Sequence, residues 1–208
     1  KERNTVTDAL DKVVFPKKKK QLPHFVAEHS LDNVLDSFEF GFDFSGRRNK
    51  TVIEMLYLTG MRRSELTGLR IQDYDESRGT IRVLGKRNKE RLIPLLDSFR
   101  SDLNLYLERR REIETEGDWF FVTDRGNKLY DKFVYNIVRK YLTMVTTIEK
   151  RSPHVLRHSF ATHMLNHGAD LTSIKELLGH ANLSATQVYT HNTFEKLKKV
   201  YKQAHPRA

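Results

Sequence analysis

The stretch from Ser152 to His191 carries side chains whose types and spacing suit a bound anion. Ser152 is a good helix N-cap and Pro153 suits the first helical position, so a helix is predicted to begin there. His154 and Arg157 then lie together in the first turn, where the helix macrodipole disfavours positive charge. The free backbone N–H groups of such a helix end, together with cationic side chains, favour a bound anion. This departure from the usual charge pattern indicates a functional site.

A second candidate anion site lies in the first half of the chain. Arg62 and Arg63 stand just before a short helix that is expected to begin at Ser64. Glu65 follows them and is interpreted as a structural partner for a nearby arginine rather than as a catalytic acid. The start of this short helix is therefore another candidate site for an anion.

The composition indicates a polyanionic partner. The chain has 208 residues and no cysteine, with 37 Lys and Arg against 27 Asp and Glu, a formal net charge of +10. Such a basic balance favours nucleic acid, with an anionic membrane surface as the rival. The chain has neither a run of about 18 apolar residues nor a signal-like start, so neither membrane spanning nor secretion is expected.

Hydrophobic periodicity predicts a mainly α fold with a small antiparallel β-sheet, an α+β class. Apolar residues recur at helical spacing in segments near residues 30–38, 48–58, 98–114, 133–141, 171–178 and 193–203. In the helix from Pro153 the same spacing makes a buried stripe of Leu156, Phe160 and Met164. Residues 80–84 and 91–95 alternate as two strands around a cationic turn, and residues 119–122 read as a further short strand.

The last helix has one apolar and one lysine-rich face. The apolar face can cover the chain's own domain or dock in a groove of a partner subunit, and the sequence leaves both open.

Five segments together resemble the motifs of tyrosine recombinases, in the family's order, and in particular those of the bacterial Xer type. They are Thr59–Leu66, Gly85–Arg91, His154–His163, Leu177–His180 and Thr186–His191, with a similar His-Pro-Arg-Ala ending at His205–Ala208. The resemblance implies the tyrosine recombinase catalytic-domain fold over residues 23–208, with a C-terminal helix at 193–203. Residues 1–22 are then a linker or the end of an N-terminal core-binding domain that is missing here.

The resemblance also implies the catalytic residues, namely Arg62, Lys86, His154, Arg157, His180 and Tyr189. Tyr189 would be the nucleophile that forms a 3'-phosphotyrosyl intermediate with DNA, and Lys86 the general acid on the leaving 5'-oxygen. Arg62 and Arg157 would clamp the phosphate, and His154 and His180 would add donors or accept the tyrosine proton. No metal and no cofactor is expected.

The implied function is site-specific DNA recombination of the Xer type, in chromosome dimer resolution, chromosome partition and cell division. Double-stranded DNA would be the partner, a homo- or heterotetramer on DNA would form through the C-terminal helix, and the location would be cytoplasmic, at the nucleoid. Candidate DNA-binding residues beyond the catalytic set are Arg63, Arg87, Lys89, Lys17, Lys18, Lys19 and Lys20. Arg87 stands where the Xer hairpin usually has glycine, and Arg63 where an apolar residue is commoner.

Four alternatives remain. An integrase or transposase of a mobile element would use the same chemistry, and a type IB topoisomerase would use it to relax supercoils. A non-catalytic module could read DNA through a helix-turn-helix at residues 153–178. A metal site could use His154 with His158, or His163 with His167, each pair four residues apart. The second pair is expected to serve packing or the helix end instead.

Overall fold

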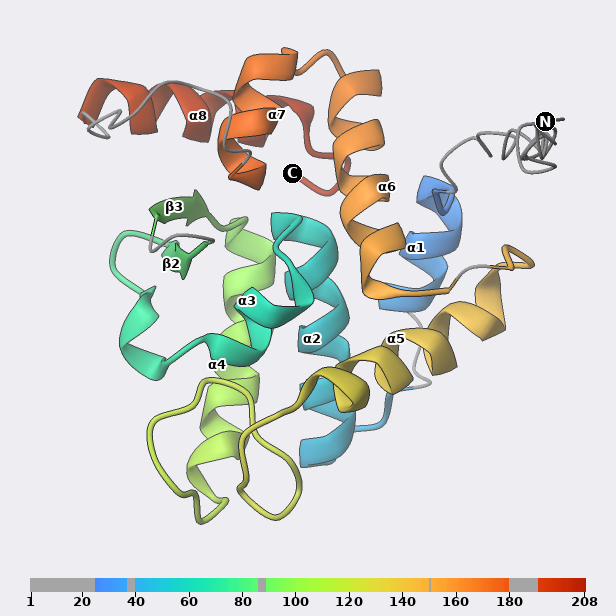
Figure 1. Ribbon diagram of the computed structural model, residues 1–208, viewed down its shortest axis with the longest axis vertical. Helices are drawn as coiled ribbons and strands as arrows, with labels where there is room; N and C mark the ends of the chain where they lie inside the picture. The colour runs from blue at the N-terminus through green and yellow to red at the C-terminus, as the bar shows by residue number, and fades with distance from the viewer. Residues whose placement is uncertain (1–24, 37–39, 86–88, 150, 180–190) are drawn as a thin grey trace, which may run out of the picture.

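The computed structural model describes residues 25–36, 40–85, 89–149, 151–179 and 191–208. Figure 1 shows helices surrounding a central one, with a small sheet at one side. The helices are α1 (Glu28–Asp36), α2 (Phe44–Thr59), α3 (Arg63–Gly68), α4 (Asp97–Arg111), α5 (Asp131–Val145), α6 (Pro153–Asn166), α7 (Leu171–Leu178) and α8 (His191–Ala204). The strands are β1 (Tyr74–Asp75), β2 (Thr80–Leu84) and β3 (Glu90–Pro94), and the predicted fold class is confirmed.

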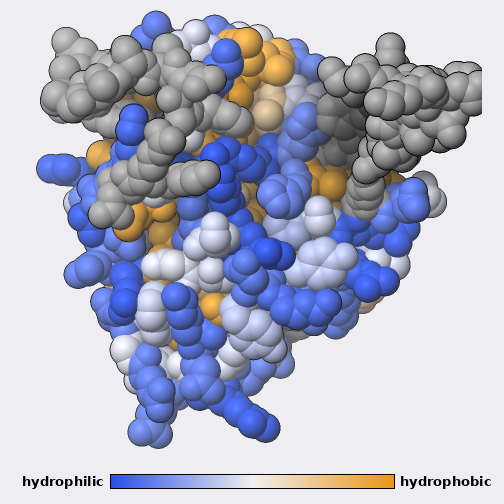
Figure 2. Space-filling view, viewed as in Figure 1, coloured by the Kyte–Doolittle hydropathy of each residue, from blue (hydrophilic) through white to orange (hydrophobic). Residues whose placement is uncertain are grey.

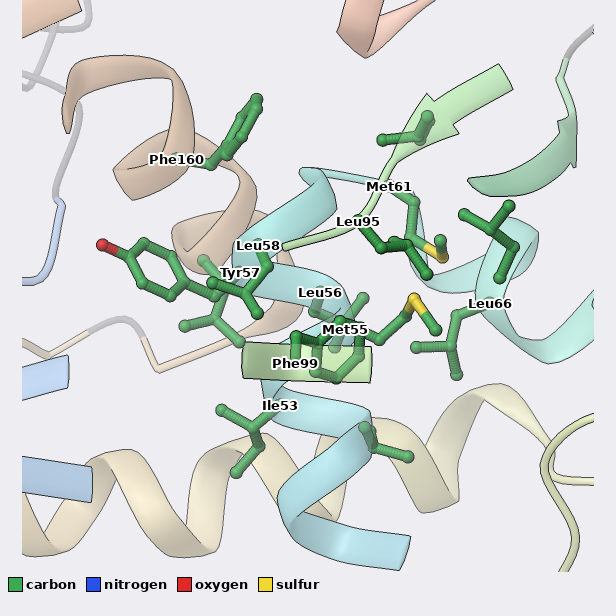
Figure 3. Packing of buried hydrophobic residues seen from close by; sticks show 14 of the residues in the cluster. Ile53, Met55, Leu56, Tyr57, Leu58, Met61, Leu66, Leu95, Phe99 and Phe160 are labelled. Carbon is green, nitrogen blue, oxygen red and sulfur yellow. The ribbon is translucent and has the colours of Figure 1, made fainter. Parts of the chain in front are cut away.

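The central helix is α2, in which every residue from Thr51 to Thr59 is buried. Its apolar side chains meet those of its neighbours in one core, where Leu56 lies beside Phe99 of α4 (Figure 3) and Phe160 of α6 lies against the end of α2. A helix buried on all sides needs apolar residues all round, and α2 has them in its second half. The helix begins four residues before the predicted start because Asp43 caps it, its Oδ1 accepting a hydrogen bond from the Gly46 N–H at 2.8 Å.

The predicted hairpin is confirmed. β2 and β3 pair antiparallel, with Thr80 opposite Pro94 and Leu84 opposite Glu90, and the two-residue strand β1 extends the sheet beyond β2. The strand predicted at residues 119–122 is wrong, because Trp119 and Val122 make only isolated bridges. The backbone there bonds to loop segments, which offer no continuous ladder.

Two helix starts also differ from prediction. α1 begins at Glu28 rather than behind Ser30, which lies inside the helix. α3 begins at Arg63, with Arg62 as the N-cap residue, because the Glu65 carboxylate accepts the Arg62 backbone N–H at 2.8 Å. Ser64, the predicted cap, is exposed within that helix.

The last helix packs on its own domain. Leu197, Tyr201 and Ala204 of α8 are buried, and the Tyr201 hydroxyl donates to the Leu58 carbonyl of α2 at 2.9 Å. Beyond α8, Arg207 forms ion pairs with Asp32 and Asp36 of α1 at 2.8 and 2.7 Å. Of the helices in the described part of the chain, none has the length and apolar composition needed to cross a bilayer.

The α2–α4 interface contains a buried carboxyl that should make stability depend on pH. Glu54 is 3% exposed, its Oε2 makes no hydrogen bond, and its Oε1 lies 3.6 Å from the Lys50 ammonium. Burial raises its pKa from 4.5 to about 8, against the opposing effect of Lys50. The folded protein therefore holds a proton between about pH 5 and 8 that the unfolded chain releases. The free energy of unfolding should fall as pH rises through that window.

Glu54→Gln tests this expectation, because the amide keeps the shape of the carboxyl and cannot ionise. We expect a flatter profile of unfolding free energy against pH, measured by urea denaturation, and a variant more stable than wild type at pH 8. Glu108→Gln, at an exposed position of α4, is the control and should run parallel to wild type. Parallel profiles for Glu54→Gln and wild type would contradict the assignment.

Candidate active site

The helix α6 begins as predicted, with Ser152 as the N-cap and Pro153 at the first position. Its apolar stripe of Leu156, Phe160 and Met164 is fully buried against the core, whereas His154 is exposed. The helix thus presents His154 to solvent and leaves Arg157 half-buried.

Arg62 and Arg157 meet at one pocket although 95 positions separate them. The pocket has a volume of about 120 Å³ and is lined by Met61, Arg62, Arg63, Tyr135, Ser152, Pro153, His154 and Arg157. In Figure 1 the first turn of α6 faces the start of α3. The two helix starts that the sequence marks as candidate anion sites therefore line one pocket.

Arg157 is held by the ends of two other helices. Its Nη1 donates to the Gly60 carbonyl at 2.5 Å, just past α2, and its Nη2 to the Leu178 carbonyl at 2.8 Å, at the end of α7. Carbonyls at helix ends lack intrahelical donors, and the guanidinium supplies them. Burial, together with the nearby charge of Arg62 and against the opposing charge of Glu65, lowers the pKa of Arg157 to about 10. Arg157 stays charged at neutral pH, in a cation-rich setting that an anion would relieve.

Arg62 is oriented by Glu65, as the sequence predicted for that carboxylate. Arg62 donates to Glu65 from its Nη1 to Oε1 at 2.8 Å, in addition to the backbone bond that caps α3. Its side chain is 35% exposed and lines the pocket. Arg62 can therefore face a ligand while one end of its guanidinium is fixed.

The other predicted residues have mixed outcomes. Arg63 lines the pocket and is ion-paired with Asp131 of α5 at 2.8 Å, and Lys89 is exposed beside β3. The remaining predicted residues lie outside the described residues, namely Lys86, Arg87, His180, Tyr189, Lys17, Lys18, Lys19 and Lys20.

The sequence interpretation missed Tyr135 and Ser152 as pocket residues. Ser152 was seen only as a helix cap. Tyr135 lies between the apolar residues of α5, and nothing in its spacing shows that its side of the helix faces Arg62.

The histidine pairs do not make a metal site in the described part of the chain, where no group of three or more His, Asp or Glu side chains is placed to hold an ion. His163 is buried and its Nδ1 lies 2.9 Å from the Tyr57 hydroxyl, and burial lowers its pKa. His167 ends α6 and lies 3.1 Å from the Glu28 carboxylate. The second pair serves packing and the helix end, as predicted.

Gly60 is a point where the site depends on the absence of a side chain. It ends α2 with a φ of 60°, and a Cβ there would lie 2.5 Å from Phe160 Cδ1 and 2.6 Å from Leu178 Cδ2. We expect Gly60→Ala to lower the free energy of unfolding by about 3 kcal/mol, from the left-handed backbone and the overpacking together. Urea denaturation monitored by circular dichroism measures it.

Gly68→Ala is the matched control for that variant. Gly68 is the last residue of α3, and a Cβ added there meets no atom within 4 Å. We expect a change within about 0.5 kcal/mol of wild type. Equal losses in the two alanine variants would show that crowding at Gly60 is not the cause.

Comparison with known proteins gives a consistent result. Residues 10–196 match the family described as "Phage integrase family". The chain is 41% identical to the tyrosine recombinase XerC of Chlorobaculum parvum, over 96% of this chain and 66% of that protein. It is 43% identical to XerC of Pelotomaculum thermopropionicum, over 96% of this chain and 67% of that protein. The chain thus spans about two thirds of the length of these relatives.

Solved structures show the same fold. The crystal structure of XerA recombinase superposes with a TM-score of 0.71 at 30% identity, covering 90% of this chain and 67% of that one. XerH site-specific recombinase, described as bound to difH substrate, gives 0.70 at 27% identity, covering 92% and 53%. With a family match over nearly all its length and the pocket described above, the chain belongs to the phage integrase family of tyrosine recombinases, enzymes that cleave and rejoin DNA.

Proposed function

We propose that this chain carries the catalytic centre of a site-specific recombinase, which cleaves and rejoins DNA through a 3'-phosphotyrosyl intermediate. The observation that carries the proposal is the meeting of Arg62, His154 and Arg157 at one pocket. A phosphodiester resists attack because its charge repels nucleophiles, so a site without a metal must gather cations around the nonbridging oxygens. Two arginines and a histidine, from the starts of α3 and α6, provide such a group.

The proposed reaction needs three further residues. The Tyr189 oxygen attacks phosphorus, the P–O5' bond breaks, and the phenolic proton passes to a base, for which His154 and His180 are the candidates. Lys86 protonates the leaving 5'-oxygen. A 5'-hydroxyl of another strand reverses the step and reseals the DNA, so no ATP is needed.

The described residues before His180 support its role. Leu178 is bound to Arg157 through its carbonyl, so the chain enters the segment that carries His180 from the side of the pocket. Lys86 follows Gly85, whose N–H donates to the Lys89 carbonyl at 2.8 Å at the end of the hairpin.

DNA is the proposed partner, and the charge of the chain supports it. A net charge of +10 favours a polyanion, and Figure 2 shows that hydrophilic residues dominate the face seen in Figure 1. Arg63 and Lys89 are proposed to contact phosphates, with Arg87 and the run Lys17 to Lys20 as further contacts. XerH is described as bound to its difH substrate, which supports DNA as the ligand of this fold.

Covalent trapping tests the proposal. The 208-residue chain is mixed with a library of nicked duplexes with randomised sequence, from which the short cleaved fragment diffuses away and leaves the protein linked to DNA. We expect a covalent adduct whose peptide map places the DNA on Tyr189. Failure to trap any duplex would contradict the proposal and favour a non-catalytic DNA-binding module.

The same chemistry can serve different purposes, and we propose chromosome dimer resolution by a Xer-type recombinase in the cytoplasm, at the nucleoid. Identity to two XerC proteins above 40% supports this choice. Sequencing the DNA trapped in cells decides it, since one chromosomal site is expected and the ends of a mobile element would indicate an integrase. Relaxation of supercoiled plasmids without a recombination site would indicate a topoisomerase.

We further propose assembly on DNA as a homo- or heterotetramer through the C-terminal helix. The apolar face of α8 is covered by its own domain, and the exposed residues include Glu195, Lys196 and Lys199. Removing residues 193–208 is a poor test, because it also deletes the buried Tyr201. Sedimentation of the intact chain bound to a duplex that carries two copies of the site found by trapping measures the assembly directly. Complexes in which the subunits do not associate with one another would contradict the proposal.

A further inference from the structure

A buried arginine outside the pocket joins the elements that carry the pocket arginines. Arg91 of β3 donates from Nη1 and Nη2 to the two oxygens of Glu65, at 3.1 and 2.8 Å, and both side chains are 4% exposed. Its Nε donates to the Leu177 carbonyl of α7 at 2.8 Å. One guanidinium thus binds α3 and α7 to the sheet at the same time.

Through Glu65, Arg91 is linked to Arg62. The same carboxylate accepts two bonds from Arg62, from the backbone N–H and from Nη1, both at 2.8 Å. Burial acts to raise the pKa of Glu65, but the bonds and charge of Arg91 and the bonds from Arg62 together outweigh it and hold the pKa below its ordinary value. Glu65 is therefore an ionised carboxylate shared by two arginines.

Through α7, Arg91 is linked to Arg157. Leu177 accepts from Arg91 and the next residue, Leu178, accepts from Arg157 Nη2 at 2.8 Å. Gly179 permits this close approach, because a Cβ there would lie 3.0 Å from Arg91 Nη1. The last turn of α7 is thus held between the two guanidinium groups.

We propose that Arg91 is a positioning residue for DNA cleavage, which sets the placement of Arg62 and Arg157 relative to each other. The proposal rests on the function proposed above. Without Arg91, Arg62 would be the remaining cation bonded to Glu65, so the carboxylate would draw Arg62 away from the phosphate. The end of α7 would also lose one of its two arginine donors, and Arg157 would shift with it.

Arg91→Lys is the test, because lysine keeps the charge but cannot reach both carboxylate oxygens and the Leu177 carbonyl in fixed geometry. The probe is a nicked duplex selected by trapping with the wild-type chain. We expect the single-turnover cleavage rate to fall about 100-fold, as for a displacement of about 1 Å in a catalytic group. The affinity for the duplex should stay within about threefold of wild type, since the proposed phosphate contacts of the other basic side chains are unchanged.

A second readout separates positioning from a general structural effect. Sulfur replaces each nonbridging oxygen of the scissile phosphate in turn, and the cleavage rate is compared with that of the oxygen substrate. If Arg62 and Arg157 are displaced, the ratios of the sulfur-substrate rate to the oxygen-substrate rate should differ between Arg91→Lys and wild type. Arg82→Lys is the matched control on β2, where Arg82 donates to Asp73 at 2.9 and 3.1 Å away from the pocket, and it should leave rate and ratios unchanged.

The outcomes distinguish the two proposals. If the wild-type chain traps DNA and Arg91→Lys cleaves within threefold of it with unchanged sulfur ratios, the positioning role is overturned and the proposed function stands. If Arg91→Lys melts well below wild type, the double variant Glu65→Gln/Arg91→Met removes both members of the buried pair and is compared, below its melting temperature, with Glu65→Gln alone, which keeps Arg91. Cleavage slower than that of Glu65→Gln, with equal binding, then supports the role of Arg91, and equal cleavage rates overturn it. A wild-type chain that traps no DNA overturns the proposed function itself.

Discussion

Tyr189→Phe is expected to abolish the covalent protein–DNA complex while leaving DNA binding intact. Phenylalanine keeps the ring and removes only the oxygen that would attack phosphorus, so no intermediate can form. The variant should bind the selected duplex with wild-type affinity, because the contacts with phosphates come from arginine and lysine side chains. Denaturing gel electrophoresis of the nicked-duplex reaction measures the adduct, and gel retardation measures the binding.

The structure supplies a sharp control for this prediction. Tyr135 of α5 lines the pocket beside Arg62, His154 and Arg157, so it is the rival nucleophile among the described residues of that pocket. Tyr135→Phe should still form the adduct. If Tyr135→Phe loses the adduct and Tyr189→Phe keeps it, the nucleophile has been assigned to the wrong residue.

Arg157→Lys is expected to lower the cleavage rate by about 10³-fold, with little change in affinity for DNA. The guanidinium of Arg157 donates to the Gly60 and Leu178 carbonyls from two nitrogens, which fixes its plane at the pocket. A lysine ammonium is a point charge on a flexible stem and cannot hold both carbonyls while facing a phosphate. The variant keeps the charge, so a large loss would come from geometry.

Single-turnover cleavage of the selected duplex measures the Arg157→Lys effect. Arg151→Lys is the matched control, because Arg151 donates to the Thr146 carbonyl at 3.2 Å just before α6 and does not line the pocket. Its cleavage rate should equal that of wild type. An Arg157→Lys rate within tenfold of wild type would show that charge alone suffices at this position.

Local signals account for the parts of the fold that the sequence predicted well. The start of α6 at Pro153, the end of α2 at Gly60 and the antiparallel hairpin each depend on residues close together in the chain. Proline at a first helical position, glycine at a helix end and alternating strands around a turn act over a few residues, so one sequence reveals them. The start of α2 was missed because an aspartate in an aromatic and glycine-rich segment gave no clear helical period.

The geometry of the site was not predictable in the same way. The resemblance identified Arg62 and Arg157, but their meeting depends on bonds that cross 97 residues to Gly60 and 21 residues to Leu178. Arg91 looked like an ordinary strand residue, because its role depends on a carboxylate 26 positions away and a helix end 86 positions away. Tertiary contacts of this kind leave no periodic trace in the sequence.

The bonds made by the end of α8 and the tail after it bear on how the protein is made. Tyr201 closes over the Leu58 carbonyl, and Arg207 reaches Asp32 across 175 residues of chain. Domains emerge from the ribosome from the N-terminus onward, so α1 and α2 are synthesised well before these partners. A nascent chain whose residues 201–207 are still inside the ribosome lacks the buried contacts that these residues make in the core. Those contacts include the one with α2, the helix that ends next to the pocket. Folding of the region around the pocket therefore waits for the synthesis of this segment.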